Sequence, residues 1–236
     1  MKGLAVIALG LLFWICGSAS TYADRDYLFS QGYQTTRKGE LEWEVYSDYN
    51  MRDFDNDDTH SFKQQHELEY GLTHRWQWAY YEVFRWDQPN DWQRDSFKIE
   101  TKYRFLESGE LPVDIALYGE YKNPNGRQKT ASDELEGKLI LSRDFGLWNV
   151  VANLITERKI NEHEDLQWEY TAGISRALNS RVRLGLEVKE TRRELQLMPV
   201  VAAMLTPHSR ILFGPAFGLT RASDDLQLRS ILEIEF

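Results

Sequence analysis

Hydrophobic and polar residues alternate along most of the chain after residue 39. In the last segment, 226–236, every even position except Ser230 is leucine, isoleucine or phenylalanine. Every odd position except Ile231 carries a charge or an amide. Successive side chains of a β-strand point to opposite faces, so this period predicts strands with one apolar face and one polar face.

Twelve segments carry this pattern, and each is ten to thirteen residues long. Strands of soluble proteins usually run about 5–6 residues, whereas a tilted strand that crosses a membrane needs about 9–11. The segment lengths therefore favour a membrane barrel over a soluble sandwich. The predicted strands are residues 39–49, 63–72, 75–86, 95–105, 111–122, 132–143, 147–158, 165–177, 181–190, 195–205, 209–219 and 226–236.

The connections between these segments alternate between short and long. Short turns are predicted at 72–74, 106–110, 144–146, 178–180 and 206–208, and longer polar loops between them. Outer-membrane barrels have short periplasmic turns, longer outside loops and an even strand number. The sequence thus predicts an all-β protein, a transmembrane antiparallel up-and-down β-barrel of about 12 strands with both termini periplasmic.

Aromatic residues make up 13% of the chain, and several fall near the ends of the apolar faces. Amphipathic rings favour the headgroup level of a membrane, so two aromatic girdles are expected. The expected girdle residues are Trp76, Tyr103 and Trp148 near the short turns, and Tyr49, Trp86, Tyr121 and Trp168 near the long loops.

Residues 1–23 have the layout of a cleaved secretory signal, with Lys2 before an apolar run and small residues after it. The run from Leu4 to Ile15 is shorter than the roughly 20 residues of a spanning helix, although an uncleaved anchor is the alternative. Cys16, the only cysteine, would leave with the signal. Residues 24–38 are predicted to form a periplasmic N-terminal segment, which either plugs the barrel or stays loose, and residues 39–236 the barrel itself.

Together, the signal sequence, the alternating strands, the girdles and the terminal residues 232–236 resemble the Gram-negative outer-membrane β-barrel class, including its porin-like members. The resemblance is architectural and points to no particular subfamily. It implies residence in the bacterial outer membrane, contact with membrane lipids and lipopolysaccharide, and assembly by the barrel-assembly machinery. In that class the C-terminal aromatic residue, here Phe236, is an assembly signal.

If the apolar face meets lipid, the charged face lines the interior, where charges require pairing or water. Either these charges pair and fill a narrow barrel, or the excess carboxylates line a wet channel that favours cations. The predicted lumen-lining residues are Glu42, Glu44, Glu67, Glu69, Lys98, Glu100, Lys102, Glu120, Glu136, Lys138, Glu169, Arg183, Glu187, Arg229 and Glu233.

The function that this pattern favours is a narrow porin-like channel for small polar or cationic solutes, with a charged, acid-rich lumen. The alternative is a non-conducting barrel with a structural or partner-binding role. A lipid hydrolase is a third possibility, but the five histidines stand in no recognisable hydrolase pattern, so no enzyme and no cofactor are predicted. The net charge of -9 argues against a nucleic-acid partner, and the oligomeric state is not predicted.

Three local features break the regular pattern. Glu82 falls on the apolar parity of its strand, so either a β-bulge re-phases it or it marks a protein–protein contact. Pro199 and Pro215 predict bulges or local edges, because proline cannot donate to the ladder.

One acidic loop has the spacing of a calcium-binding loop. Asp53, Asp55 and Asp57 match that spacing, but Asp58 stands where the turn glycine belongs. We therefore expect a solvated acidic loop and no metal, with weak divalent binding that bridges lipopolysaccharide phosphates as the alternative.

Overall fold

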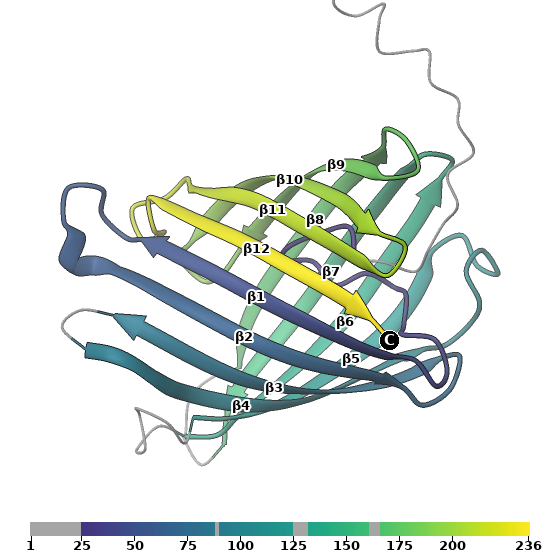
Figure 1. The fold of residues 1–236 in the computed structure, drawn as a ribbon, viewed down its shortest axis with the longest axis horizontal. Coiled ribbons are helices and arrows are strands. Elements are labelled where there is room, and N and C mark those ends of the chain that lie inside the picture. The colour runs from purple at the N-terminus through teal and green to yellow at the C-terminus, as the bar shows by residue number, and fades with distance from the viewer. Residues whose placement is uncertain (1–24, 88–89, 125–131, 161–165) are drawn as a thin grey trace, which may run out of the picture.

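The computed structural model describes residues 25–87, 90–124, 132–160 and 166–236, so the predicted signal lies outside the described residues. Twelve antiparallel strands form a closed barrel in which each strand pairs with its sequence neighbours and β1 pairs with β12 (Figure 1). The strands are β1 (Leu41–Met51), β2 (His60–Gly71), β3 (Trp76–Asp87), β4 (Asn90–Arg104), β5 (Asp114–Asn123), β6 (Glu134–Phe145), β7 (Trp148–Lys159), β8 (Gln167–Ala177), β9 (Val182–Glu190), β10 (Leu195–Thr206), β11 (Ser209–Gly218) and β12 (Leu226–Glu235).

The fold confirms the predicted twelve-strand barrel, with differences at a few strand ends. The strands β2 and β4 begin earlier than predicted, so the connection between β3 and β4 spans only residues 88–89. Phe62 and Trp92, which lie in these added stretches, pack edge to face at 5.3 Å. This aromatic contact favours continued pairing where polar residues alone suggested a loop. The remaining strand bounds shift by three residues or fewer.

The two ends of the barrel differ in their connections. The turn end carries the β2–β3, β4–β5, β6–β7, β8–β9 and β10–β11 connections, and the loop end carries the others. Lys38 pairs with Gly71 at the turn end, and Phe236 there donates its backbone N–H to Leu41 at 2.9 Å. The start of β1 and the C-terminus therefore lie at the same end of the barrel. Among the described residues, no helix is long and apolar enough to cross a membrane.

The outer surface of the barrel is apolar and its inner surface is mixed. In β10, Val201 is 45% exposed, whereas its neighbours Val200 and Ala202 are buried inside. The same alternation runs through the other strands, as the period of two requires. The predicted girdle residues lie near strand ends on the outer parity: Trp76, Tyr103 and Trp148 at the turn end, and Tyr49, Trp86, Tyr121 and Trp168 at the loop end.

The two prolines interrupt one ladder without shifting it. Pairing between β10 and β11 stops at Leu197 with Phe217 and resumes at Val201 with Phe213 in the same register. Pro199 and Pro215 stand between these pairs, where both strands lack an N–H donor. Of the two predicted alternatives, the prolines therefore produce a local unpaired edge and not a bulge, and the register shift in this ladder lies between Met204 and Thr206.

Glu82 keeps its outward parity in β3. The register shift between β3 and β4 comes after it, between Val83 and Phe84, and so does not turn its side chain inward. Its carboxylate instead accepts two hydrogen bonds from Arg94 of β4, each 2.7 Å long. The re-phasing alternative is thus wrong, and an ion pair faces outward.

Candidate functional site

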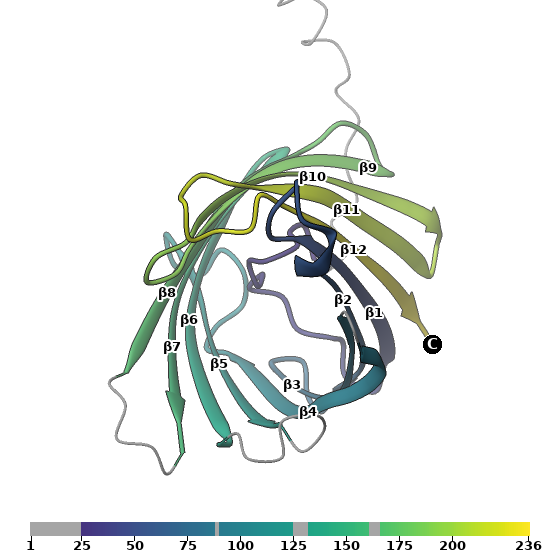
Figure 2. The ribbon, with the colours of Figure 1, turned by 90° about the vertical axis from the view of Figure 1, so that its left-hand side faces the viewer.

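The N-terminal segment lies inside the barrel (Figure 2). We call residues 25–37 the inner segment. Leu28 and Ser30 are fully buried against the barrel wall, and Lys38 then leads out to β1. The sequence leaves open whether this stretch plugs the barrel. The structure places the described residues in the interior, so the term periplasmic segment does not describe their position.

The first anchor of the inner segment is Glu187 on β9. Its two carboxylate oxygens accept the backbone N–H groups of Leu28, Phe29 and Ser30, at 2.5, 3.0 and 2.8 Å. Successive backbone N–H groups that converge on one anion form a concave binding site for it. Glu187 is 1% exposed, so these three donors satisfy a charge that is costly to bury.

A second anchor holds the next residue of the inner segment. The side chain of Asn153 on β7 accepts the N–H of Gln31 at 2.6 Å and donates to its carbonyl at 3.0 Å. Further along, Thr36 donates its hydroxyl to the carboxylate of Glu69 and its backbone N–H to Oε1 of Gln77. The backbone of the inner segment thus forms hydrogen bonds with the wall, and the partners are wall side chains in place of a neighbouring strand's backbone.

The third anchor is ionic and also involves β9, closer to the turn end of that strand. Asp26 lies 3.0 Å from the guanidinium groups of both Arg183 on β9 and Arg210 on β11. Its second oxygen accepts a hydrogen bond from Ser175 at 3.2 Å. Asp26, Arg183 and Arg210 also line a cavity of about 240 Å³ at the turn end of the barrel, next to the inner segment.

Apolar side chains of the inner segment fill the space between the walls. Leu28 packs into an internal cluster that includes Met198 and Leu212, while Tyr27 and Tyr33 join a second cluster against Ile140. Gly173 leaves room for this packing, since a Cβ there would lie 2.5 Å from the Tyr27 ring. The inner segment is therefore held inside the barrel by apolar packing as well as by hydrogen bonds.

Replacing Glu187 with glutamine is expected to loosen residues 28–30, the part of the inner segment that Glu187 binds. The amide keeps the shape of the side chain but loses one acceptor oxygen, so three N–H groups compete for the other. We expect faster amide hydrogen exchange at Leu28, Phe29 and Ser30 in the variant. Exchange of the β-strand amides should stay unchanged.

The matched control for this variant is Glu169→Gln on the adjacent strand β8. Glu169 pairs with Lys189 at 3.1 Å and makes no hydrogen bond to the inner segment among the described contacts. Equal exchange rates in Glu187→Gln and the wild-type protein would contradict the anchoring role.

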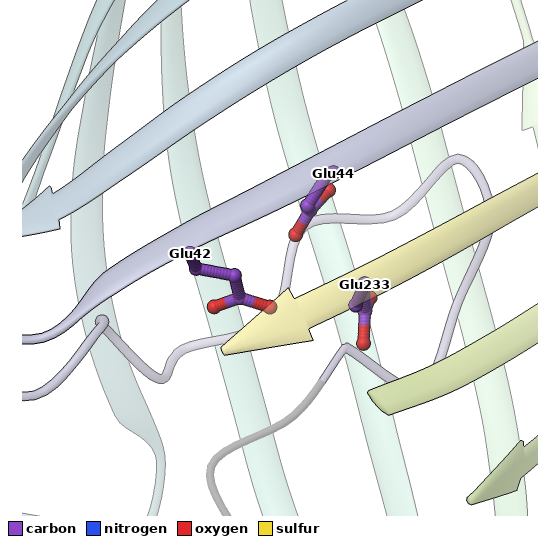
Figure 3. A group of neighbouring side chains, drawn as sticks. All are labelled: Glu42, Glu44 and Glu233. Carbon is purple, nitrogen blue, oxygen red and sulfur yellow. The ribbon is translucent and has the colours of Figure 1, made fainter. Parts of the chain in front are cut away.

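Carboxylates gather on the wall formed by β12, β1 and β2. Figure 3 shows Glu42 and Glu44 of β1 and Glu233 of β12 projecting to the same side of the sheet. One oxygen of each lies within 4.8 Å of one oxygen of the others, and Glu44, Glu67 and Glu69 form a second such group. Among the described residues these two groups could hold a hard divalent cation.

Cations already lie against this carboxylate wall. Arg25 of the inner segment approaches Glu44 to 3.8 Å, and Arg210 approaches Glu233 to the same distance. The hydroxyl of Tyr46 donates to Glu44 and also lies 2.7 Å from Glu67. The inner segment therefore supplies part of the positive charge that the wall needs.

Towards the loop end, charged side chains pair across neighbouring strands. Lys98 lies 3.0 Å from Glu120, and Arg229 lies 3.4 Å from Asp48. Lys122 of β5 likewise pairs with Glu134 of β6 at 2.7 Å, whereas Lys138 pairs with Glu136 of its own strand, β6, at 3.2 Å. The ring of Phe29 in the inner segment faces the cationic groups of Lys189 and Arg229, which lie about 5 Å from the ring centre.

All fifteen residues predicted for the lumen lie on the inward parity of their strands. Five of them, Glu42, Glu44, Glu67, Glu69 and Glu233, lie on the carboxylate wall, and Glu187 and Arg183 contact the inner segment from β9. Six others, Lys98, Glu120, Glu136, Lys138, Glu169 and Arg229, form the charge pairs described above. Sequence reasoning missed the inner partners Asp26, Gln77, Asn153 and Arg210. Asn153 stands between two apolar inward residues of β7, Val151 and Ile155, and this position is the signal that could have found it.

The acidic loop between β1 and β2 is organised by its own backbone. Asp53 accepts the N–H of Asp55 at 2.9 Å, and Asn56 caps a short 3₁₀ helix, Asp57–Thr59. Neither metal-compatible group among the described residues includes Asp53, Asp55 or Asp57. The solvated-loop interpretation is consistent with this arrangement.

Comparison with known proteins identifies the fold. No protein-family model matches the sequence, and no curated protein is similar to it. Among solved structures, the barrel is similar to the KdgM porin with a TM-score of 0.61 and 9% identity, over 82% of this chain and 99% of that one. The NanC porin gives 0.58 and 10%, over 82% and 98%.

A KdgM porin solved in complex with disordered oligogalacturonate gives a TM-score of 0.57 and 9% identity, over 84% of this chain and 98% of that one. The likeness extends over most of this chain and nearly all of each porin. The chain therefore has the twelve-stranded barrel fold of these outer-membrane porins.

Proposed function

We propose that this protein is a porin-like channel of the bacterial outer membrane, closed at rest by its own inner segment. The observation that carries the proposal is the way residues 25–37 are held inside the barrel. Within the described part of the chain, this inner segment continues into the wall at Lys38 and is otherwise held by hydrogen bonds, ion pairs and packing. Such a segment can leave the interior without any change in the barrel.

The solutes that best fit the interior are small, polar or cationic. Ten of the fifteen predicted lumen residues are glutamates and five are basic. Carboxylates that line a pore favour cations over anions. Although a KdgM porin was solved with oligogalacturonate, the carboxylate-rich wall of this barrel does not suit an acidic sugar.

The membrane contacts follow from the outer face. We infer that the turn end is periplasmic, that the girdle rings lie at the two headgroup levels, and that lipid and lipopolysaccharide surround the barrel. Phe236 at the turn end, 71% exposed, is positioned for recognition by the barrel-assembly machinery. The expected signal, residues 1–23, would direct the chain out of the cytoplasm.

Single-channel recording in planar bilayers tests the proposed channel. With the inner segment in place, we expect a mostly closed protein with infrequent openings, since the segment must leave before ions pass. In a potassium chloride gradient the open-state reversal potential should lie on the cation-selective side. Anion selectivity would contradict the acidic-lumen argument even if current flowed.

The alternative is a barrel that never conducts, and the internal apolar clusters favour it. Leu28, Met198 and Leu212 belong to a packed apolar core inside the barrel, whereas a water-filled pore is lined by polar side chains. Absence of current in the wild-type protein and in variants that lack the inner segment would support this alternative and contradict the channel.

A further inference from the structure

The lipid-facing surface of the barrel carries one cluster of polar side chains at mid-strand. We call it the outer polar patch, and every member lies at least four residues from either end of its strand. Its members come from five adjacent strands, β12 and β1 to β4. They are Ser230, Ser47, Gln64, His66, Glu82 and Arg94.

Strand pairing makes the outer polar patch continuous. Ser47 of β1 is directly opposite Ser230 on one side and Gln64 on the other. His66 of β2 is directly opposite Glu82 of β3. Glu82 in turn binds Arg94 of β4, so neighbouring members touch or face each other across every strand boundary.

These side chains point away from the interior. Ser47 lies between Tyr46 and Asp48, which are both buried inside. The imidazole of His66 stacks on Trp43 at 6.0 Å and meets Phe84 edge to face at 6.1 Å, and both of these rings are on the outer parity.

Most of the outer polar patch lacks internal partners. Within the described residues, the side chains of Ser47, Gln64, His66 and Ser230 make no hydrogen bond. Arg94 and Glu82 pair with each other, but their side chains remain 41% and 29% exposed. Lipid chains offer no hydrogen-bond partner, so polar groups at this depth are costly unless another molecule satisfies them.

On the described residues of the other strands there is no comparable cluster. At mid-strand on β5 to β11 the outward positions are apolar or glycine: Gly119, Leu139, Ala152, Ala172, Leu186, Val201 and Phe213. Apolar residues also flank the patch towards both barrel ends, with Phe62 and Trp86 on one side and Leu68 and Trp78 on the other. The patch therefore lies within the apolar band and away from the headgroup level, where lipid phosphates are found.

We propose that a second copy of this chain covers the outer polar patch, so that the protein forms a symmetric dimer in the membrane. Two barrels in one membrane share their orientation, so a two-fold axis along the membrane normal brings the same surface of each copy together. The patch suits this contact because it is self-complementary. The amide of Gln64 both donates and accepts, and Glu82 and Arg94 supply both charges.

The shape of the outer surface also supports a dimer contact at the outer polar patch. Next to the patch, towards the turn end, lies an apolar groove of about 470 Å³ lined by residues that include Trp43, Leu68 and Phe236. His66 and Glu82 of the patch also line it, so a partner side chain that filled the groove would bring its own patch against this one. Polar side chains that bond across an interface, with apolar packing beside them, are the usual means of association within membranes.

Cysteine cross-linking in native outer membranes tests the dimer. Ser47→Cys places a thiol in the patch, and Ala172→Cys places one at the same kind of outward, mid-strand position on β8. Both variants share the same background, in which Cys16 is the only other cysteine. A bifunctional maleimide should convert Ser47→Cys, but not Ala172→Cys, into a species of twice the monomer mass.

A second measurement addresses the contribution of the patch itself. Replacing Gln64 and His66 together with leucine leaves an apolar outer face that lipid tolerates, so the barrel should still fold. Its mass in detergent should fall from that of a dimer to that of a monomer. Three results would overturn the proposal: no adduct at Ser47, an adduct with a different polypeptide, or a wild-type protein that is monomeric with lipid bound.

Discussion

Deletion of residues 26–36 is expected to produce a barrel that conducts continuously. The deletion removes the residues that bind Glu187 and Asn153 and those that fill the centre of the two apolar clusters. It leaves Lys38 in place to pair with Gly71 at the start of the barrel. Mean current in planar bilayers should rise severalfold over the wild-type protein, because the open state no longer waits for the inner segment to leave.

The barrel must be shown to fold without the inner segment. A folded barrel migrates differently on a gel before and after heating, and this shift should persist in the deletion variant. If the deleted barrel does not fold, Glu187→Gln provides the same test with the whole chain present. A folded deletion variant that stays silent would contradict the proposal that the segment closes a channel.

Replacing Val201 with arginine is expected to lower the free energy of unfolding more than the same replacement near a strand end. Val201 is 45% exposed at the middle of β10, where the outer surface meets the centre of the bilayer. An arginine at the bilayer midplane costs a membrane barrel about 2–4 kcal/mol. The free energy of unfolding, measured by denaturant titration in lipid vesicles, should fall by this amount.

Leu205 on the same strand is the matched control for Val201. It also faces outward and is 56% exposed, but it lies at the turn end of β10. Near the headgroups the cost of arginine falls to about 0–1 kcal/mol. Equal losses for Val201→Arg and Leu205→Arg would contradict the assigned membrane position of the barrel.

The barrel could be predicted from the sequence because each strand is indicated by the pattern of its own residues. A period of two along 226–236 states which side chains share a face, and strands of this length already favour a membrane. The direction of each face follows from the parity alone. Glu82 follows the same rule: its parity places it on the outer face, and the bulge that its charge left open as an alternative does not occur there.

The inner segment could not be predicted because its contacts are distant in sequence. Leu28 and Glu187 are separated by 159 residues, and residues 25–37 carry no period that indicates a partner. Its position depends on shape, such as the space that Gly173 leaves for Tyr27, and shape emerges only once the barrel is closed. The sequence therefore left two alternatives open for this segment, a plug inside the barrel or a loose chain outside it, and could not distinguish them.

The separation between Leu28 and Glu187 also constrains how the protein matures. The inner segment precedes every strand in the chain, yet Glu187, which binds it, lies in β9, so the segment is synthesised before the strand that holds it. The segment cannot dock until β9 is in place. Docking of the inner segment is thus expected to be a late event in folding, and a probe attached to residues 28–30 would report when the barrel has been completed.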